Sequence, residues 1–381
     1  MDAPLETEKV PFGAKILHFL KTNSVAVVAF LAALVTSFIV PPDKDYLGYF
    51  DLKTLACLFS VLAVVCALRG IRFFVWLSYR IVLLCKDMRL SALALVYITF
   101  IGSMLIANDM ALITFLPLGF MVLSVTGKEK YMARLFILQN IAANLGGMLT
   151  PFGNPQNLYL YSRFNIPDGQ FFLIMLPSFL VSIVLFTLAC LLFFRPEKLS
   201  LPDERIPVPK KRAIFYLVLF AVAIIMVFRI LPFYIGFAVI LIALLITDRP
   251  ALKKVDYPLL ITFVFFFIFA GNMGRIEPVR TFISGLLQRN TLLYSTLSCQ
   301  FISNVPSAIL LSQFTTNYPE LLIGVNIGGT GTLIASLASL ITFREYTRLN
   351  RGKGGRYLLL FSAFNFTFLA ILIVFNLLIR G

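Results

Sequence analysis

The sequence predicts an all-α integral membrane protein with two inverted-topology repeats, each with a re-entrant hairpin and a broken transmembrane helix. Three observations support this fold: the apolar composition, the long apolar runs and an internal repeat. Of the 381 residues, 59% are apolar, 13% are charged and 39 are Phe. Because a water-soluble domain cannot bury this much hydrocarbon, we expect the chain to lie in a lipid bilayer.

Apolar runs that could cross about 30 Å of hydrocarbon as helices recur from about residue 24 to about residue 379. The alternating pattern of barrel strands is not seen, so helices are the expected spanning elements. Full spans are predicted at about 24–40, 50–68, 131–160, 171–194, 213–230, 233–247, 257–271, 319–343 and 357–379.

Two further apolar segments, about 90–125 and 291–316, are predicted as hairpins that enter and leave the membrane on the same side. With a cytoplasmic N-terminus, 25 of the 33 Lys and Arg residues then lie on the cytoplasmic side, as the positive-inside rule requires. The net charge of +15 therefore indicates orientation in a plasma membrane, and no nucleic acid partner is expected. The cytoplasmic stretches are 9–21, 69–89, 128–134, 195–212, 249–254 and 344–356.

An internal repeat divides the chain. Residues 144–158 align without a gap on residues 326–340, an offset of 182, and residues 106–113 match residues 302–309. Because a single connecting span separates the two copies, we expect them to be inverted. The predicted organisation is repeat 1 over 1–194, a cytoplasmic linker over 195–212, a connecting helix over 213–230 and repeat 2 over 231–381.

Glycine and proline interrupt the predicted helix around Thr150, and glycines recur in the matching segment of repeat 2. Unpaired backbone is tolerated at membrane depth only where protein, water or an ion satisfies it. Inverted repeats with interrupted helices are typical of secondary transporters, whose site lies near the bilayer midplane. Carbonyl and amide oxygens suit a hard cation such as Na⁺, and helix N-termini suit an anion.

Asp109 is the one acidic residue that falls within a predicted membrane segment and away from its ends. A carboxylate at this depth is costly unless it is paired or neutralised, so such residues usually line a transport pathway. Asp109 could bind the coupling cation or carry a proton. The alternative is a carboxylate that caps the following half-helix.

The run Thr150-Pro-Phe-Gly-Asn-Pro-Gln-Asn157, together with the paired hairpin tips, resembles the ion transporter superfamily. This superfamily includes citrate and dicarboxylate/sodium symporters, arsenite/antimonite permeases and sodium/proton antiporters, and the chain is most similar to compact bacterial citrate-transporter-like permeases. The resemblance implies elevator-type alternating access, a homodimer in the bacterial inner membrane, and no cofactor beyond Na⁺ or H⁺ as coupling ion. An enzyme is not expected.

The branches of that superfamily differ at the hairpin tips. The dicarboxylate branch reads Ser-Asn-Thr at both tips, and here only Asn108, Ser303 and Asn304 match that pattern. The Asn-Asp pair of the first tip is more similar to the arsenite permease branch, whereas residues 153–157 are nearer to the carboxylate branch. The expected substrate is a small anion, a carboxylate such as citrate or a dicarboxylate. The alternatives are arsenite/antimonite efflux and sodium/proton antiport.

The candidate site residues come from the tips and the broken helices, with Na⁺ expected where each tip meets a broken helix. For the amides and hydroxyls the alternative is interhelical hydrogen bonding, and for the glycines it is close helix packing. The run 263–269, rich in Phe, is predicted to face lipid or to serve as packing surface. Substrate-binding candidates are Asn108, Asp109, Asn154, Ser303, Asn304 and Ser336. Cation-coupling candidates are Asn108, Asp109, Asn144, Gly147, Thr150, Asn157, Asn326, Gly329 and Thr332.

Overall fold

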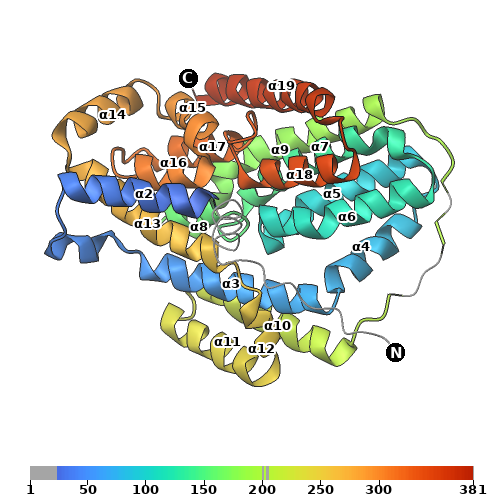
Figure 1. Cartoon of the computed structure of the whole chain (residues 1–381), viewed down its shortest axis with the longest axis horizontal. Helices are drawn as coiled ribbons and strands as arrows, with labels where there is room; N and C mark the ends of the chain where they lie inside the picture. Colours follow the sequence, from blue (N-terminus) through green and yellow to red (C-terminus); the bar gives the residue numbers. More distant parts are fainter. Residues whose placement is uncertain (1–23, 200, 203–205, 381) are drawn as a thin grey trace, which may run out of the picture.

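A computed structural model describes residues 24–199, 201–202 and 206–380. These residues form helices and short loops, with one isolated β-bridge between Asp87 and Lys198, so the all-α prediction is confirmed (Figure 1). The basic stretch 9–21 lies outside the described residues, and the linker 195–212 is described only in part.

Among the described residues, six helices are long and apolar enough to cross a membrane. Three shorter helices are also apolar, and large exposed side chains such as Phe38 on α2 and Ile246 on α11 suit contact with lipid. The six are α3 (Leu52–Gly70), α5 (Met88–Ile106), α6 (Asn108–Val125), α9 (Asp168–Phe193), α13 (Tyr257–Arg275) and α19 (Gly354–Arg380). The shorter three are α2 (Ser24–Ile39), α4 (Phe73–Leu83) and α11 (Phe233–Thr247).

The segment predicted as the first hairpin consists of α5 and α6, each of which is long enough to cross the membrane. A pair of helices that each cross the membrane also enters and leaves on the same side of it, as a re-entrant hairpin does. The predicted side of the basic loops therefore does not change. The second segment has the shorter helices α15 (Thr291–Ile302) and α16 (Asn304–Leu311). The re-entrant form of these hairpins and the inversion of the repeats remain predictions.

A single residue reverses the chain in each hairpin. Ala107 joins α5 to α6 with φ 65° and ψ 151°, and Ser303 joins α15 to α16 with φ 75° and ψ 158°. Both are non-glycine residues at positive φ, a conformation that costs roughly 1–3 kcal/mol and persists only where the surroundings enforce it. The two tips therefore share one backbone geometry.

Both predicted broken helices are interrupted. The first runs from α7 (Met132–Gly146) through the 3₁₀ turn η3 (Gly147–Leu149) and resumes at α8 (Pro155–Arg163). The second consists of α17 (Tyr318–Ile327) and α18 (Leu337–Leu349), and Gly331 between them has φ 117°. Proline at the first position of α8 suits a helix start, and glycine suits the positive φ of the second break.

Side-chain amides satisfy the carbonyls that these interruptions expose. Asn157 Nδ2 donates to the carbonyls of Gly147, Met148 and Thr150 at 3.0–3.2 Å. Gln300 Nε2 donates to the carbonyls of Gly328 and Thr330 at 2.9 and 3.0 Å. A buried backbone group without a partner costs several kcal/mol in a membrane. By donating to these carbonyls, the two amides stabilise the interrupted helices.

A threonine hydroxyl ties each interruption to its neighbouring hairpin. Thr150 Oγ1 donates to the carbonyl of Met104 at 2.7 Å, and Thr332 Oγ1 donates to the carbonyl of Gln300 at 3.0 Å. Met104 and Gln300 occupy matching positions, each three residues before the residue that reverses the chain. The same bond therefore fixes the tip to the broken helix in both halves.

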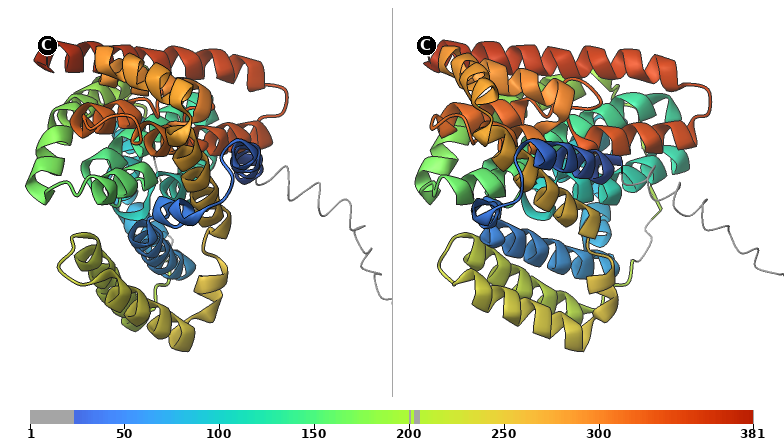
Figure 2. Two further views of the ribbon diagram at one scale, coloured as in Figure 1. Left: turned by 90° about the vertical axis from the view of Figure 1, so that its left-hand side faces the viewer. Right: turned by 60° about the vertical axis from the view of Figure 1, so that its left-hand side comes forward.

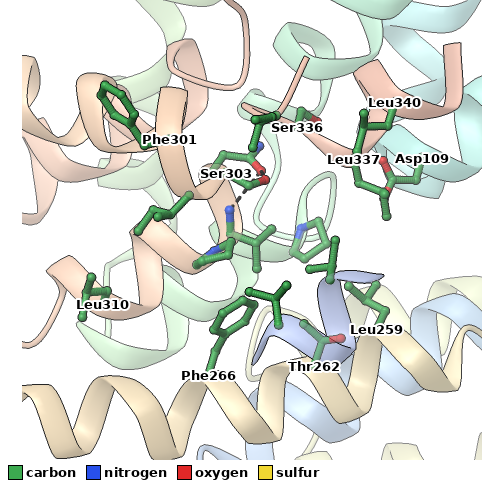
Figure 3. A pocket seen from close by; sticks show the side chains of 18 of the residues that line it. Asp109, Leu259, Thr262, Phe266, Phe301, Ser303, Leu310, Ser336, Leu337 and Leu340 are labelled. Carbon is green, nitrogen blue, oxygen red and sulfur yellow. Dashed lines mark hydrogen bonds between the residues drawn. The ribbon is translucent and has the colours of Figure 1, made fainter. Parts of the chain in front are cut away.

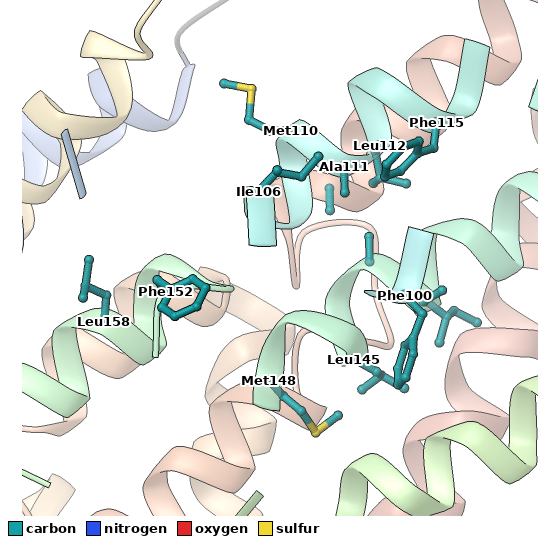
Figure 4. Packing of buried hydrophobic residues seen from close by; sticks show 14 of the residues in the cluster. Phe100, Ile106, Met110, Ala111, Leu112, Phe115, Leu145, Met148, Phe152 and Leu158 are labelled. Atoms are coloured by element: carbon teal, nitrogen blue, oxygen red, sulfur yellow. The ribbon is translucent and has the colours of Figure 1, made fainter. Parts of the chain in front are cut away.

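The helices pack in two groups that meet at the tips (Figures 1 and 2). In one group α3 packs against α10 (Lys210–Val227), α11 and α12 (Arg249–Lys253), while α2 lies along α13. In the other, α5, α6 and α7 pack together, and α7 also contacts α9, α18 and α19. Phe100, Phe115 and Leu145 fill the interior of that second group (Figure 4). The amphipathic helix α14 (Glu277–Arg289) lies outside, between α13 and α15.

Glu197 connects the segment after α9 to two other loops. Its carboxylate accepts hydrogen bonds from Lys128 Nζ and Lys130 Nζ at 2.6 Å and from Tyr131 OH at 2.8 Å. Its backbone carbonyl accepts from the N–H of Met88 at 2.8 Å. The hydrogen bonds from both lysines and the tyrosine lower the pKa of Glu197 to about 2.

We predict that this cluster makes stability depend on pH below neutrality. Because the folded-state pKa of Glu197 lies below its ordinary value of 4.5, its stabilisation is complete above about pH 5 and is lost as the pH falls toward 2. In Glu197→Gln the thermal midpoint should be lower at pH 6 and should fall less between pH 5 and pH 3. Thermal unfolding of the purified protein measures both quantities.

Glu129→Gln is the matched control. Glu129 is exposed, lies between Lys128 and Lys130, and forms no ion pair within the described part of the chain. An equal loss in both variants would contradict a specific role for Glu197.

Candidate functional site

A cavity of about 440 Å³ lies where the two hairpin tips and the broken helices face α2 and α13 (Figure 3). Its volume is in the usual range for small-molecule sites. We call the polar residues at one end the polar rim, and the side chains of α2 and α13 opposite them the apolar wall. The polar rim consists of Asn108, Asp109, Ser303, Asn304 and Ser336. The apolar wall consists of Val25, Val28, Ala32, Leu259, Phe266 and Phe269, with Thr262 among them.

Four helices of the described chain, α6, α8, α16 and α18, begin at this cavity, where Asn108, Pro155, Asn304 and Leu337 line it. A helix N-terminus carries a partial positive charge, and the first N–H groups have no partner within the helix. The helix starts therefore contribute partial positive charge at the cavity, although no Lys or Arg is among its lining residues.

Asn144 of α7 connects the first tip to the second broken helix. Its Oδ1 accepts from Asn108 Nδ2 at 3.1 Å and from the Ser336 hydroxyl at 2.8 Å. The Asn108 Oδ1 in turn accepts from the N–H of Asp109 at 3.0 Å. Asn144 is 1% exposed and does not line the cavity. It therefore holds Asn108 and Ser336 in place from behind the lining.

Asn326 of α17 forms the corresponding connection in the opposite direction. Its Oδ1 accepts from Asn154 Nδ2 at 3.3 Å, and its Nδ2 donates to Asn157 Oδ1 at 2.6 Å. The pair Asn144–Ser336 and the pair Asn326–Asn154 are related by the offset of 182 residues. Each broken helix is thus bonded, through its first half, to the second half of the other.

Asp109 lies at the first turn of α6 and is the one charged residue among those that line the cavity. Its side chain forms no capping hydrogen bond, and its buried Oδ1 has no partner among the described residues. The backbone N–H of Asp109 itself donates to Asn108 Oδ1 at 3.0 Å. The capping alternative therefore has no hydrogen bond to support it.

The structure brings the predicted substrate residues together, with one exception. Asn108, Asp109, Ser303, Asn304 and Ser336 line the cavity, whereas Asn154 lies behind it and is fully buried.

Of the predicted cation residues, Asn108 and Asp109 belong to the polar rim, and the others do not line the cavity. Asn144 and Asn326 join the broken helices, and Gly329 lies so close to the Asn304 and Asn144 side chains that a larger residue would crowd them. Gly147 packs against Asn154 and Gly153. Thr150, Asn157 and Thr332 make the backbone contacts described above. Two buried amide oxygens here, Asn154 Oδ1 and Gln156 Oε1, have no hydrogen-bond partner among the described residues.

The structure also shows functional candidates that the sequence did not indicate. Phe266 and Phe269 pack with the hydrophobic core, as predicted for the run 263–269, and in addition they line the cavity. Leu259, Thr262, Phe266 and Phe269 follow helical spacing and share one face of α13, and the single polar residue on that face was the available signal. Gln300 was also missed, because its role depends on carbonyls far away in the sequence.

Comparisons with known proteins agree with this architecture. Residues 16–319 match the sequence profile of the CitMHS family, which is described as a citrate transporter. Over 314 residues the chain is 35% identical to the uncharacterized transporter MJ0456 of Methanocaldococcus jannaschii, covering 81% of this chain and 84% of that protein. Over 320 residues it is 27% identical to the inner membrane protein YbiR of Escherichia coli K12, covering 82% of this chain and 85% of the relative. The chain therefore belongs to the CitMHS citrate transporter family and is a multi-pass membrane transporter.

Proposed function

We propose that this protein is an ion-coupled secondary active transporter of a small organic anion of the carboxylate class. The observation that carries the proposal is the meeting of four helix N-termini at one cavity. Such termini stabilise negative charge without any basic side chain, and they do so best where water is scarce. Citrate and dicarboxylates, which the sequence predicts, are members of this class.

Coupling to a cation follows from the position of Asp109. An ionised Asp109 and a carboxylate substrate in one cavity repel each other. The substrate therefore binds better when a cation neutralises Asp109. A proton on Asp109, or Na⁺ beside it, removes this repulsion. We therefore propose that H⁺ or Na⁺ enters with the anion.

The polar groups beneath the rim support Na⁺ as one of the two options. The unpartnered Asn154 Oδ1 lies beside Gly147 of the first interruption, and the unpartnered Gln156 Oε1 belongs to the start of α8. Neutral oxygens of this kind are suitable ligands for a hard cation. The matching region of repeat 2 has the Asn304 side chain close to Gly329 and the broken helix. We propose these two junctions as the places where Na⁺ would bind.

The arrangement of the cavity supports an elevator-type mechanism. One side is formed by tips and broken helices that are bonded to one another, and the other side by α2 and α13, which present mainly apolar side chains. An apolar contact without interlocking hydrogen bonds suits sliding. We propose that the first side moves with its cargo past the second, within a homodimer in the plasma membrane whose N-termini are cytoplasmic.

We predict that Asp109→Asn abolishes ion-coupled uptake into proteoliposomes. The fold should be retained, since Asn is similar in size and a carboxylate without a partner costs free energy in a bilayer. The thermal midpoint is therefore expected to stay the same or to rise. The exposed Asp45→Asn serves as the control, because its side chain is 76% exposed and lies outside the cavity. Full coupled uptake by Asp109→Asn would remove Asp109 from the mechanism.

A thermal-shift screen of the purified protein tests the ligand class. Citrate, succinate, phosphate, arsenite and antimonite are each added with and without Na⁺ at two pH values. A carboxylate at 100 times its Kd should stabilise the folded state by about 2.7 kcal/mol, and the cation should strengthen the effect. Stabilisation by arsenite or antimonite alone would instead support efflux of those oxyanions. Stabilisation by Na⁺ with no effect of any anion would support sodium/proton antiport.

A further inference from the structure

The chemistry of the cavity is one-sided. The polar rim holds three of the four helix starts and the single charge of the lining, whereas the lining of α2 and α13 offers one hydroxyl, that of Thr262. That hydroxyl already donates to the carbonyl of Pro258 at 2.7 Å. An anionic group thus finds hydrogen-bond donors at one end of the cavity only.

Even at the polar rim few donors are available. Asn108 Nδ2 and the Ser336 hydroxyl both donate to Asn144, and the N–H of Asn304 donates to the carbonyl of Ala335 at 2.9 Å. Asn304 Nδ2 forms no hydrogen bond with any described residue. The side-chain donors of the rim are therefore largely engaged within the protein, which favours one anionic head group over two.

The remainder of the lining is apolar and extends to the mouth. Phe266 is 7% exposed and faces the cavity from the opposite side to Ser303 and Ser336 (Figure 3). At the mouth Val28, Phe301 and Ile334 are 62%, 77% and 56% exposed. A carboxylate placed against this surface would lose its water without gaining a partner, whereas a methylene group gains free energy there.

We propose that the cavity takes an amphipathic monoanion, with one anionic head at the polar rim and an apolar body along the apolar wall, in preference to a small polyanion such as citrate. This inference rests on the proposed function, since it narrows the class of anion transported. It assigns Phe266 and Leu259 as specificity-determining residues that contact the apolar body.

The test measures binding of two series of anions to the full-length protein in nanodiscs, with protein-free nanodiscs as the blank for partition into lipid. The first series is acetate, butanoate and hexanoate, and the second is succinate and citrate. Each buried methylene should tighten binding about fourfold, so hexanoate should bind roughly 16-fold more tightly than butanoate. Succinate and citrate should bind more weakly than hexanoate.

Phe266→Asn should weaken hexanoate binding more than acetate binding and so flatten the dependence on chain length, and remaining acetate binding shows that the variant is folded. Phe265→Asn is the matched control, because Phe265 is the adjacent residue of α13, does not line the cavity and packs edge-on against Phe30 at 5.2 Å. Leu259→Asn replaces Phe266→Asn if the latter fails to bind acetate.

Two results would overturn the inference, and they differ in what they leave standing. Citrate or succinate binding more tightly than hexanoate, with Phe266→Asn and Leu259→Asn unchanged, would refute the amphipathic substrate and leave anion transport intact. Failure of every anion in both series to bind at any pH or Na⁺ concentration would refute the proposed function as well.

Discussion

Backbone groups inside a bilayer have no water to bond, and this constraint determines how the site is built. Both broken helices expose backbone carbonyls in the protein interior, and an amide side chain supplies the missing donor in each. Asn157 does so for the first and Gln300 for the second. The starts of α8 and α18 at the cavity are the other products of the same interruptions. Without these two amides, the carbonyls of the interruptions would be buried without a donor, and the interruptions would be destabilised.

Side-chain hydrogen bonds also hold the strained backbone of the two hairpin tips. Ala107 and Ser303 hold positive φ angles that neither residue prefers, and the Thr150 and Thr332 hydroxyls bind the helices that lead into them. Over-determined geometry of this kind keeps a helix start at a fixed position. The helix starts around the cavity are therefore preorganised by bonds from residues that do not line it.

The helices and their interruptions could be predicted from the sequence, because glycine, proline and apolar length act locally. The breaks near Thr150 and before Ser336 were predicted within a few residues, as was the turn at Asn108. The role of α13 could not be predicted. Phe266 has the same local signal as the Phe residues that pack elsewhere, and only the tertiary arrangement places it opposite Ser303. For the same reason Asn154 was expected at the substrate, although it bonds to Asn326 behind the cavity.

The hydrogen bonds between Asn144 and Ser336, and between Asn326 and Asn154, join the two halves and constrain how their sequences can diverge. If the two halves arose by duplication of one ancestral segment, each copy has since been held to the other at these positions. A change in one copy leaves a buried amide or hydroxyl of the other without its partner. The halves are then free to diverge on their lipid-facing surfaces, while the four partners are constrained to change together.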